Sequence, residues 1–302
     1  MIKSVIVTNY LGESVQLKLG EVEPKSGLLI TKIEGLGPAK ANINTTEMAT
    51  NDGDVYNSSR LNKRNIVFTM QFGWAPTVED ARQNSYKYFP IKRKVGLLFE
   101  TDNRICEIQG YVESNEPDIF TESPQTKISV ICPDPYFYSV DENVLLFYSM
   151  ESGFEFPFEN DSLEEPLMEM GAIQLKQEQT IYYTGDAETG VVINIHAIGN
   201  VENITIFNMG TREVMKIDTG KLKEMTGYGL IAGDDLTIST LRGKKSVYLL
   251  RNGVKTNVIN CLDRQADWFQ LAKGDNVFAY TAEYGSVNLQ FRITNQMVYE
   301  GV

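Results

Sequence analysis

The chain has 302 residues, of which 42% are hydrophobic and 23% are charged, and its formal net charge is −12. This length and composition are ordinary for a folded protein with two domains. The negative charge argues against nucleic-acid recognition, and no apolar run reaches the roughly 18 residues of a membrane span, so we expect no membrane insertion.

The polar segment 38–65, PAKANINTTEMATNDGDVYNSSRLNKRN, is the first distinctive feature. It has a turn signal, Asp52-Gly53, near its middle and sparse apolar anchors such as Ile43 and Tyr56. The residues leave two interpretations open, an ordinary surface hairpin or an arm that becomes ordered only against another chain. Composition alone favours the hairpin, because long unstructured excursions are uncommon in compact domains.

Strands are predicted wherever apolar and polar residues alternate, because such alternation is typical of half-buried antiparallel sheets. The segment NIVFTMQF, residues 65–72, shows the pattern, and so do 105–112, 128–132, 191–198, 203–208, 236–241 and 247–250. Asn252-Gly253 is a hairpin signal after the last of these. The clearest alternation is VNLQFRIT, residues 287–294, where one face carries Val287, Leu289, Phe291 and Ile293.

One helix is predicted over about 77–89. Thr77 and Asp80 form a capping box after Pro76, and Pro90 ends the apolar stripe that follows. A second, weaker candidate, SLEEPLMEM at 162–170, is interrupted by Pro166. Many strands and one helix predict an all-β chain of two β-sandwich domains.

The stretch ICPDPYFY, residues 131–138, predicts the end of the first domain. Pro133 and Pro135 cannot donate to a sheet, so the strand before them should end at Cys132 and the chain should cross to a second unit. Residues 141–190 then carry twelve acids against a single base, Lys176. We interpret this segment as a solvated acidic face.

Residue types give no catalytic, metal or cofactor site. Cys106, Cys132 and Cys261 are far apart and lack a CxxC pair, which is typical of buried thiols in a protein made in a reducing cytosol. The single histidine, His196, has no nucleophile-elbow motif beside it. The sequence also lacks the CxxC and HxxxH spacings of zinc-binding residues. Paired carboxylates for glycoside hydrolysis exist in any acidic protein, so a hydrolase is only a weak third interpretation.

The aromatic residues Trp268, Tyr182 and Tyr183 are candidates for contact with a saccharide or a partner protein. An exposed aromatic ring on a β-sandwich can stack on a sugar. A core position for Trp268 is the more frequent arrangement in sandwiches, so both interpretations stay open.

The order of several segments resembles the distal tail proteins of long-tailed phages, often called Dit. The similarity covers nearly the whole chain. Its most specific segments are IEGLGPAKANIN, DGDVYNSSRLNKRNIVFTMQF, KYFPIKRKVGLLFETDNR, GYVESNEPDIF, ISVICPDPYF, GDDLTISTLRGKKSVYLLRNG, DWFQLAKGDNVFAY and the closing YEGV.

This resemblance implies a hexameric ring at the phage tail tip, made in the host cytoplasm and performing no catalysis. It implies an N-terminal ring-forming sandwich over 1–138, a galectin-like or carbohydrate-module-like sandwich over 139–284, and a final segment 285–302 that returns to the first domain, with VNLQFRIT as the candidate strand. By the same resemblance, residues 38–65 become a belt that wraps the neighbouring subunit. The implied interface residues are Ile43, Asp52, Gly53, Tyr56, Arg60 and Arg64.

The partners implied are other copies of the chain, the tail tube protein, a tail-associated lysin or tail fibre hub, and a receptor-binding protein or host saccharide. The alternative function is a carbohydrate-binding module on the tail tip, using Trp268 or the two tyrosines.

Overall fold

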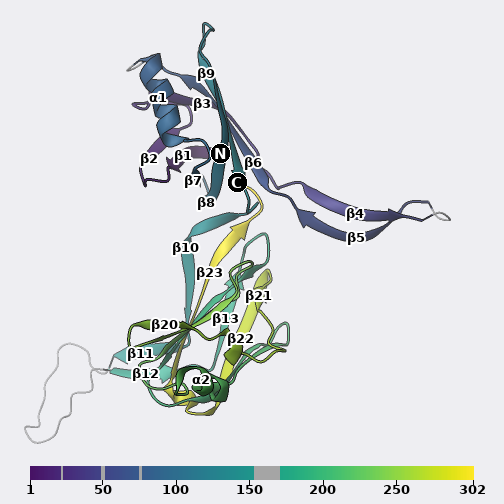
Figure 1. The fold of residues 1–302 in the computed structure, drawn as a ribbon, viewed down its shortest axis with the longest axis vertical. Coiled ribbons are helices and arrows are strands. Elements are labelled where there is room, and N and C mark those ends of the chain that lie inside the picture. Colours follow the sequence, from purple (N-terminus) through teal and green to yellow (C-terminus); the bar gives the residue numbers. More distant parts are fainter. Residues whose placement is uncertain (22, 49–51, 75–76, 153–170) are drawn as a thin grey trace, which may run out of the picture. The chain divides into compact units, whose positions relative to one another are not determined.

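The computed structural model describes all residues except 22, 49–51, 75–76 and 153–170 (Figure 1). The chain divides into two compact units. Unit 1 comprises Met1–Asp141 together with Val298–Val302, and unit 2 comprises Glu142–Met297. The polypeptide therefore passes between the units twice. The predicted all-β class is confirmed, with two α-helices among the described residues.

Unit 1 is built on one antiparallel sheet with the strand order β2-β1-β7-β8-β9-β6-β3. Its core lies among alternate residues of these strands, including Phe68, Met70 and Phe99, which are fully buried. The elements are β1 (Ile2–Thr8), β2 (Ser14–Lys18), β3 (Leu28–Glu34), β4 (Ala41–Glu47), β5 (Asp54–Leu61), β6 (Arg64–Phe72), α1 (Val78–Tyr88), β7 (Lys94–Thr101), β8 (Ile105–Asp118), β9 (Gln125–Cys132) and β10 (Phe137–Leu146).

Helix α1 begins where the capping box predicts it. The Thr77 hydroxyl accepts a hydrogen bond from the Asp80 backbone N–H at 3.1 Å, which satisfies one of the free N–H groups of the first turn. Ala81 and Ser85 face the sheet and are buried. The weaker helix candidate at 162–170 lies outside the described residues.

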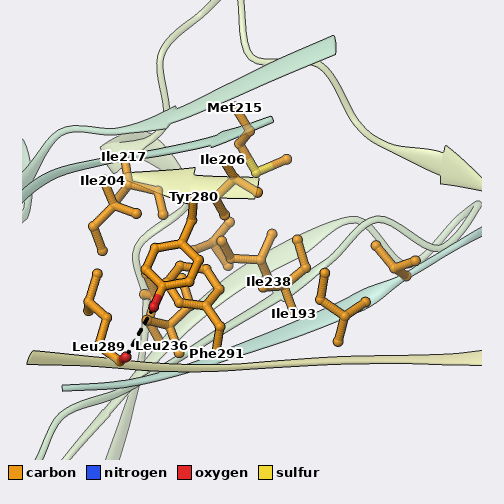
Figure 2. Packing of buried hydrophobic residues seen from close by; sticks show 14 of the residues in the cluster. Ile193, Ile204, Ile206, Met215, Ile217, Leu236, Ile238, Tyr280, Leu289 and Phe291 are labelled. Carbon is orange, nitrogen blue, oxygen red and sulfur yellow. Dashed lines mark hydrogen bonds between the residues drawn. The ribbon is translucent and has the colours of Figure 1, made fainter. Parts of the chain in front are cut away.

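Two larger antiparallel sheets of unit 2 enclose a second core, and the described part of the unit also has two two-stranded sheets. One sheet has the order β23-β15-β18-β19-β20, and the other has the order β13-β22-β16-β17. Figure 2 shows Ile193 and Ile238 of the first sheet beside Ile206 and Tyr280 of the second. The aromatic rings of Tyr280 and Phe291 stack at 3.9 Å between centroids.

The remaining elements of unit 2 follow in chain order. They are β11 (Tyr148–Ser152), β12 (Gly171–Leu175), β13 (Glu178–Tyr183), β14 (Thr189–Gly190), β15 (Val192–Ala197), β16 (Glu202–Asn208), β17 (Glu213–Ile217), α2 (Thr219–Thr226), β18 (Asp235–Ser239), β19 (Ser246–Arg251), β20 (Val254–Asn257), the 3₁₀ turn η1 (Ile259–Cys261), β21 (Gln270–Leu271), β22 (Gly274–Tyr284), the 3₁₀ turn η2 (Ser286–Asn288) and β23 (Leu289–Tyr299).

The segment VNLQFRIT does not return to unit 1, which corrects the expectation for it. Its strand begins only at Leu289 and pairs with β15, so residues 289–294 belong to unit 2. Val287 lies in η2 and is 66% exposed. Alternation shows which face of a strand is buried but not which sheet the strand joins. The segment that returns to unit 1 is Val298–Val302.

The crossing after Cys132 also differs in one respect from the prediction. Strand β9 ends at Cys132 as expected. The aromatic residues that follow do not yet leave unit 1, because Phe137 is fully buried in its core, edge-on to Phe99 with ring centroids 5.7 Å apart. The Asp134 carboxylate holds this bend by accepting the Tyr138 hydroxyl at 2.6 Å.

Candidate interface arm and aromatic sites

The arm, residues 38–65, forms a two-stranded antiparallel hairpin of β4 and β5 (Figure 1). The residues of β4 and β5 are all exposed apart from the half-buried Leu61. Polar side chains join the strands, with the Asn44 amide donating to the Ser58 hydroxyl at 3.1 Å. Among the described residues of the β4–β5 hairpin, none belongs to either hydrophobic core.

Five of the six predicted interface residues lie on this exposed hairpin. Ile43 and Tyr56 are 60% and 61% exposed, although both are large apolar side chains. Asp52 and Arg60 are also exposed, and Gly53 adopts a left-handed φ of +88° in the turn. Exposed apolar side chains on a hairpin without a core are typical of a surface that a partner covers.

Arg64 lies elsewhere, at the root of the arm inside unit 1, where it is 4% exposed. Its guanidinium donates hydrogen bonds to four backbone carbonyls, and its planar group lies 4.5 Å from the Phe137 ring centroid. Loss of water around the guanidinium lowers the pKa of Arg64. The four acceptors are Pro135 O at 2.7 Å, Gly35 O at 2.7 Å, Gly37 O at 2.5 Å and Glu300 O at 2.6 Å.

These contacts join three segments that are far apart in the sequence. Gly35 and Gly37 precede the arm, Pro135 belongs to the crossing, and Glu300 belongs to the returning segment. The Val302 N–H also donates to Leu36 O at 3.0 Å. Arg64 is therefore a positioning residue that fixes the arm root, and it is not available to a neighbouring chain.

Gly35 is required at this root. Its φ is +85°, and a Cβ atom there would lie 2.0 Å from the Asn65 carbonyl oxygen. Only glycine tolerates both the left-handed backbone and the close approach.

The three aromatic candidates are not equivalent. Tyr182 is 67% exposed, whereas Tyr183 is 1% exposed and donates its hydroxyl proton to Ala187 O at 2.6 Å. Trp268 is half-buried against the core of unit 2, and the Lys245 ammonium lies 5.1 Å from its ring centroid. Tyr183 is thus a core residue, and Tyr182 is the one of the three with a freely accessible ring.

Unit 2 contains a buried ion pair between Asp234 and Arg251 that the sequence did not predict. Asp234 is 1% exposed, and its carboxylate accepts from Arg251 Nε at 2.7 Å and from the Ile231 N–H at 2.9 Å. The missed signal was an arginine that ends the strand β19.

His196 and the cysteines occupy structural positions. His196 Nδ1 lies 2.7 Å from an Asp235 carboxylate oxygen, across neighbouring strands. All three cysteines are buried and unpaired. Among the described residues, no group of three or more His, Cys, Asp or Glu side chains is arranged to hold a metal ion. None of the described helices is long and apolar enough to cross a membrane.

Burial should make the thiols inert in the folded protein. It raises the pKa from 9.0 to about 11 for Cys106 and Cys261 and to about 12 for Cys132. The folded state holds these protons more tightly than the unfolded state, so this stabilisation is complete below pH 9 and is lost as the pH rises towards 11 and above. We therefore expect the free energy of unfolding to fall as the pH is raised above 9.

A thiol reagent at about pH 8 should modify none of the cysteines in the native protein and all three in denaturant. Rapid modification of the native protein would contradict the buried positions.

Comparison with known proteins finds similarity to phage tail components. Residues 184–294, which lie within unit 2, match the model of the siphovirus-type tail component, C-terminal domain. The crystal structure of SPP1 Dit, described as a paradigm of the hub adsorption apparatus in phages that infect Gram-positive bacteria, has a TM-score of 0.63. It is 13% identical, and the match covers 98% of this chain and 99% of SPP1 Dit. The resemblance to the distal tail proteins is confirmed.

Two further structures align over most of the Dit-like chain. Both are of the phage P2 baseplate in its activated conformation, with Ca and with Sr, at TM-scores of 0.45 and 0.46 and 11% identity. They cover 98% and 97% of this chain and the same shares of the matched chains. Among the curated proteins, none matches the chain.

Proposed function

We propose that this Dit-like chain is a structural protein of a phage tail tip that assembles as a hexameric ring. In this proposal the ring is the hub between the tail tube and the baseplate or host-adhesion apparatus, and it performs no chemistry. Its neighbours are the tail tube protein and a tail-associated lysin or tail fibre hub, and its place in the virion is the tail tip.

The exposed arm is the observation that carries the proposal. A two-stranded hairpin without a core is only marginally stable in water, and its outer edges have unpaired N–H and C=O groups. A ring subunit needs two different surfaces that complement each other head to tail. The Dit-like fold supports the proposal, because SPP1 Dit is itself described as a hub of an adsorption apparatus.

Deletion of residues 42–58 tests the proposal directly. The intact protein should elute at six times the 34.0 kDa of one chain, measured by light scattering after size exclusion. The deletion variant should elute as a monomer, because the arm supplies one of the two complementary surfaces. Its circular dichroism spectrum should still show folded β-structure, since the arm contributes nothing to the core. A hexamer formed without the arm would contradict the assignment.

A carbohydrate-binding role for unit 2 is the second candidate, and the 67% exposed ring of Tyr182 is the observation that favours it. Selective binding on a glycan array, abolished by Tyr182→Ala or Trp268→Ala but not by Tyr183→Phe, would support this role. A blank array would favour the purely structural hub, with a receptor-binding protein as a further proposed partner.

A further inference from the structure

The turn end of the arm carries negative charge that the chain does not neutralise. Glu47 and Asp54 are directly opposite each other on β4 and β5, and Asp52 lies in the turn between them. Like charges in directly opposed positions destabilise a hairpin. Among the described residues, no basic side chain forms an ion pair with any of these three acids, which we call the acidic tip.

Exposed apolar side chains lie beside the acidic tip. Met48 and Val55 are each 47% exposed, and Tyr56 is 61% exposed. An apolar cluster beside uncompensated charge is typical of a binding surface, because the apolar contacts supply affinity and the charges select the partner.

The basic residues of the arm itself are too far from the acidic tip to neutralise its charge. Lys40, Arg60 and Lys63 lie at the opposite end of the hairpin. Strands of this length separate the two ends by about 20 Å at roughly 3.3 Å per residue. Charges in solvent interact weakly beyond about 8 Å at physiological salt.

The turn before β7 and the first residue of β7 carry basic side chains on unit 1. Lys92, Arg93 and Lys94 are consecutive and exposed, and we call them the basic patch. Within the described part of the chain, none of the three forms an ion pair with a carboxylate. The nearby carboxylate of Glu13 is already held by Lys87 at 2.8 Å.

Apolar side chains accompany the basic patch as well. Ile91 is 52% exposed, and the turn after β1 adds Tyr10 and Leu11, which are 52% and 67% exposed. The two turns are in contact, because the Arg93 guanidinium lies 5.1 Å from the Tyr10 ring centroid. The basic patch is therefore the edge of a mixed apolar and cationic surface.

We infer that the acidic tip of one copy docks on the basic patch of the next copy. The inference rests on the proposed function, since it names the surface that the arm engages in a head-to-tail ring. Both surfaces combine exposed apolar residues with uncompensated charge of opposite sign, and no hydrogen bond or ion pair joins them among the described residues of one chain. Head-to-tail closure requires such a pair of unlike surfaces on every subunit.

Charge reversal tests the inference. Glu47→Lys with Asp54→Lys, and separately Lys92→Glu with Lys94→Glu, should each weaken assembly at least about tenfold, measured as the concentration at half-dissociation by light scattering. The variant with all four substitutions should recover to within about threefold of the wild type, because the charges again complement each other. The matched control Lys18→Glu with Lys127→Glu makes the same change of net charge at exposed positions elsewhere on unit 1 and should assemble normally.

The inference is overturned if the basic-patch variant assembles like the wild type, or if the four-substitution variant is as weak as the weaker double variant. The deletion of residues 42–58 separates the two hypotheses. Loss of assembly on deletion with normal assembly of the basic-patch variant would leave the ring proposal standing and reject this docking surface. Normal assembly of the deletion variant would reject the ring proposal itself.

Discussion

Replacement of Arg64 by methionine is expected to lower the free energy of unfolding of unit 1 by about 3 kcal/mol or more. The methionine fills much of the volume but donates no hydrogen bond. It therefore leaves four backbone carbonyls, of Gly35, Gly37, Pro135 and Glu300, without the donor that they share. Arg64 is itself 4% exposed, and a hydrogen bond from a charged donor contributes about 1.5–3 kcal/mol.

Chemical denaturation measures this loss, and hydrogen exchange locates it. Exchange should accelerate at residues 35–37 and 298–302 and stay unchanged in the core strands of unit 2. Arg60→Met is the matched control, because Arg60 is exposed on the arm and its loss should change the free energy of unfolding by less than about 0.5 kcal/mol. Equal effects of the two substitutions would show that the carbonyl cluster does not fix the arm root.

Replacement of Phe291 by alanine is expected to destabilise unit 2 by about 3–5 kcal/mol. The Phe291 ring is 1% exposed and stacks on Tyr280 (Figure 2). The Phe147 ring lies 6.0 Å from the Phe291 ring between centroids. Truncation leaves a cavity between two sheets that cannot fully collapse.

The matched control is Val287→Ala, four residues earlier in the same alternating segment. Val287 is 66% exposed in η2, so its truncation should cost less than about 0.5 kcal/mol. Thermal unfolding followed by circular dichroism would compare the two variants. A large loss for Val287→Ala would mean that the alternating face extends beyond Leu289.

The strands were predictable because alternation depends only on neighbouring residues. The predicted strands at 65–72 and 203–208 lie within β6 and β16. The predicted turn at Asn252-Gly253 has φ values of 51° and 77°. Sheet membership was not predictable in the same way. Nothing in VNLQFRIT indicates that its partner is β15, since pairing depends on contacts with residues about 100 positions away.

The arm was predictable from the sequence, whereas the contacts at its root were not. The polar composition and the Asp52-Gly53 turn identified the hairpin, and exposure of Ile43 and Tyr56 follows from the lack of a core to cover them. The buried position of Arg64 could not be foreseen, because its partners are backbone carbonyls and those carry no residue signature. Helix α2 was missed, although Asp218 and Gly227 cap its ends and were a readable signal.

The double passage of the chain has a consequence for biosynthesis. Residues 298–302 complete the arm root, yet they leave the ribosome only after all of unit 2 has been translated. A nascent or prematurely terminated polypeptide thus lacks the Glu300 carbonyl and the Val302 amide that anchor the hairpin. Incomplete products would therefore present a poorly oriented arm.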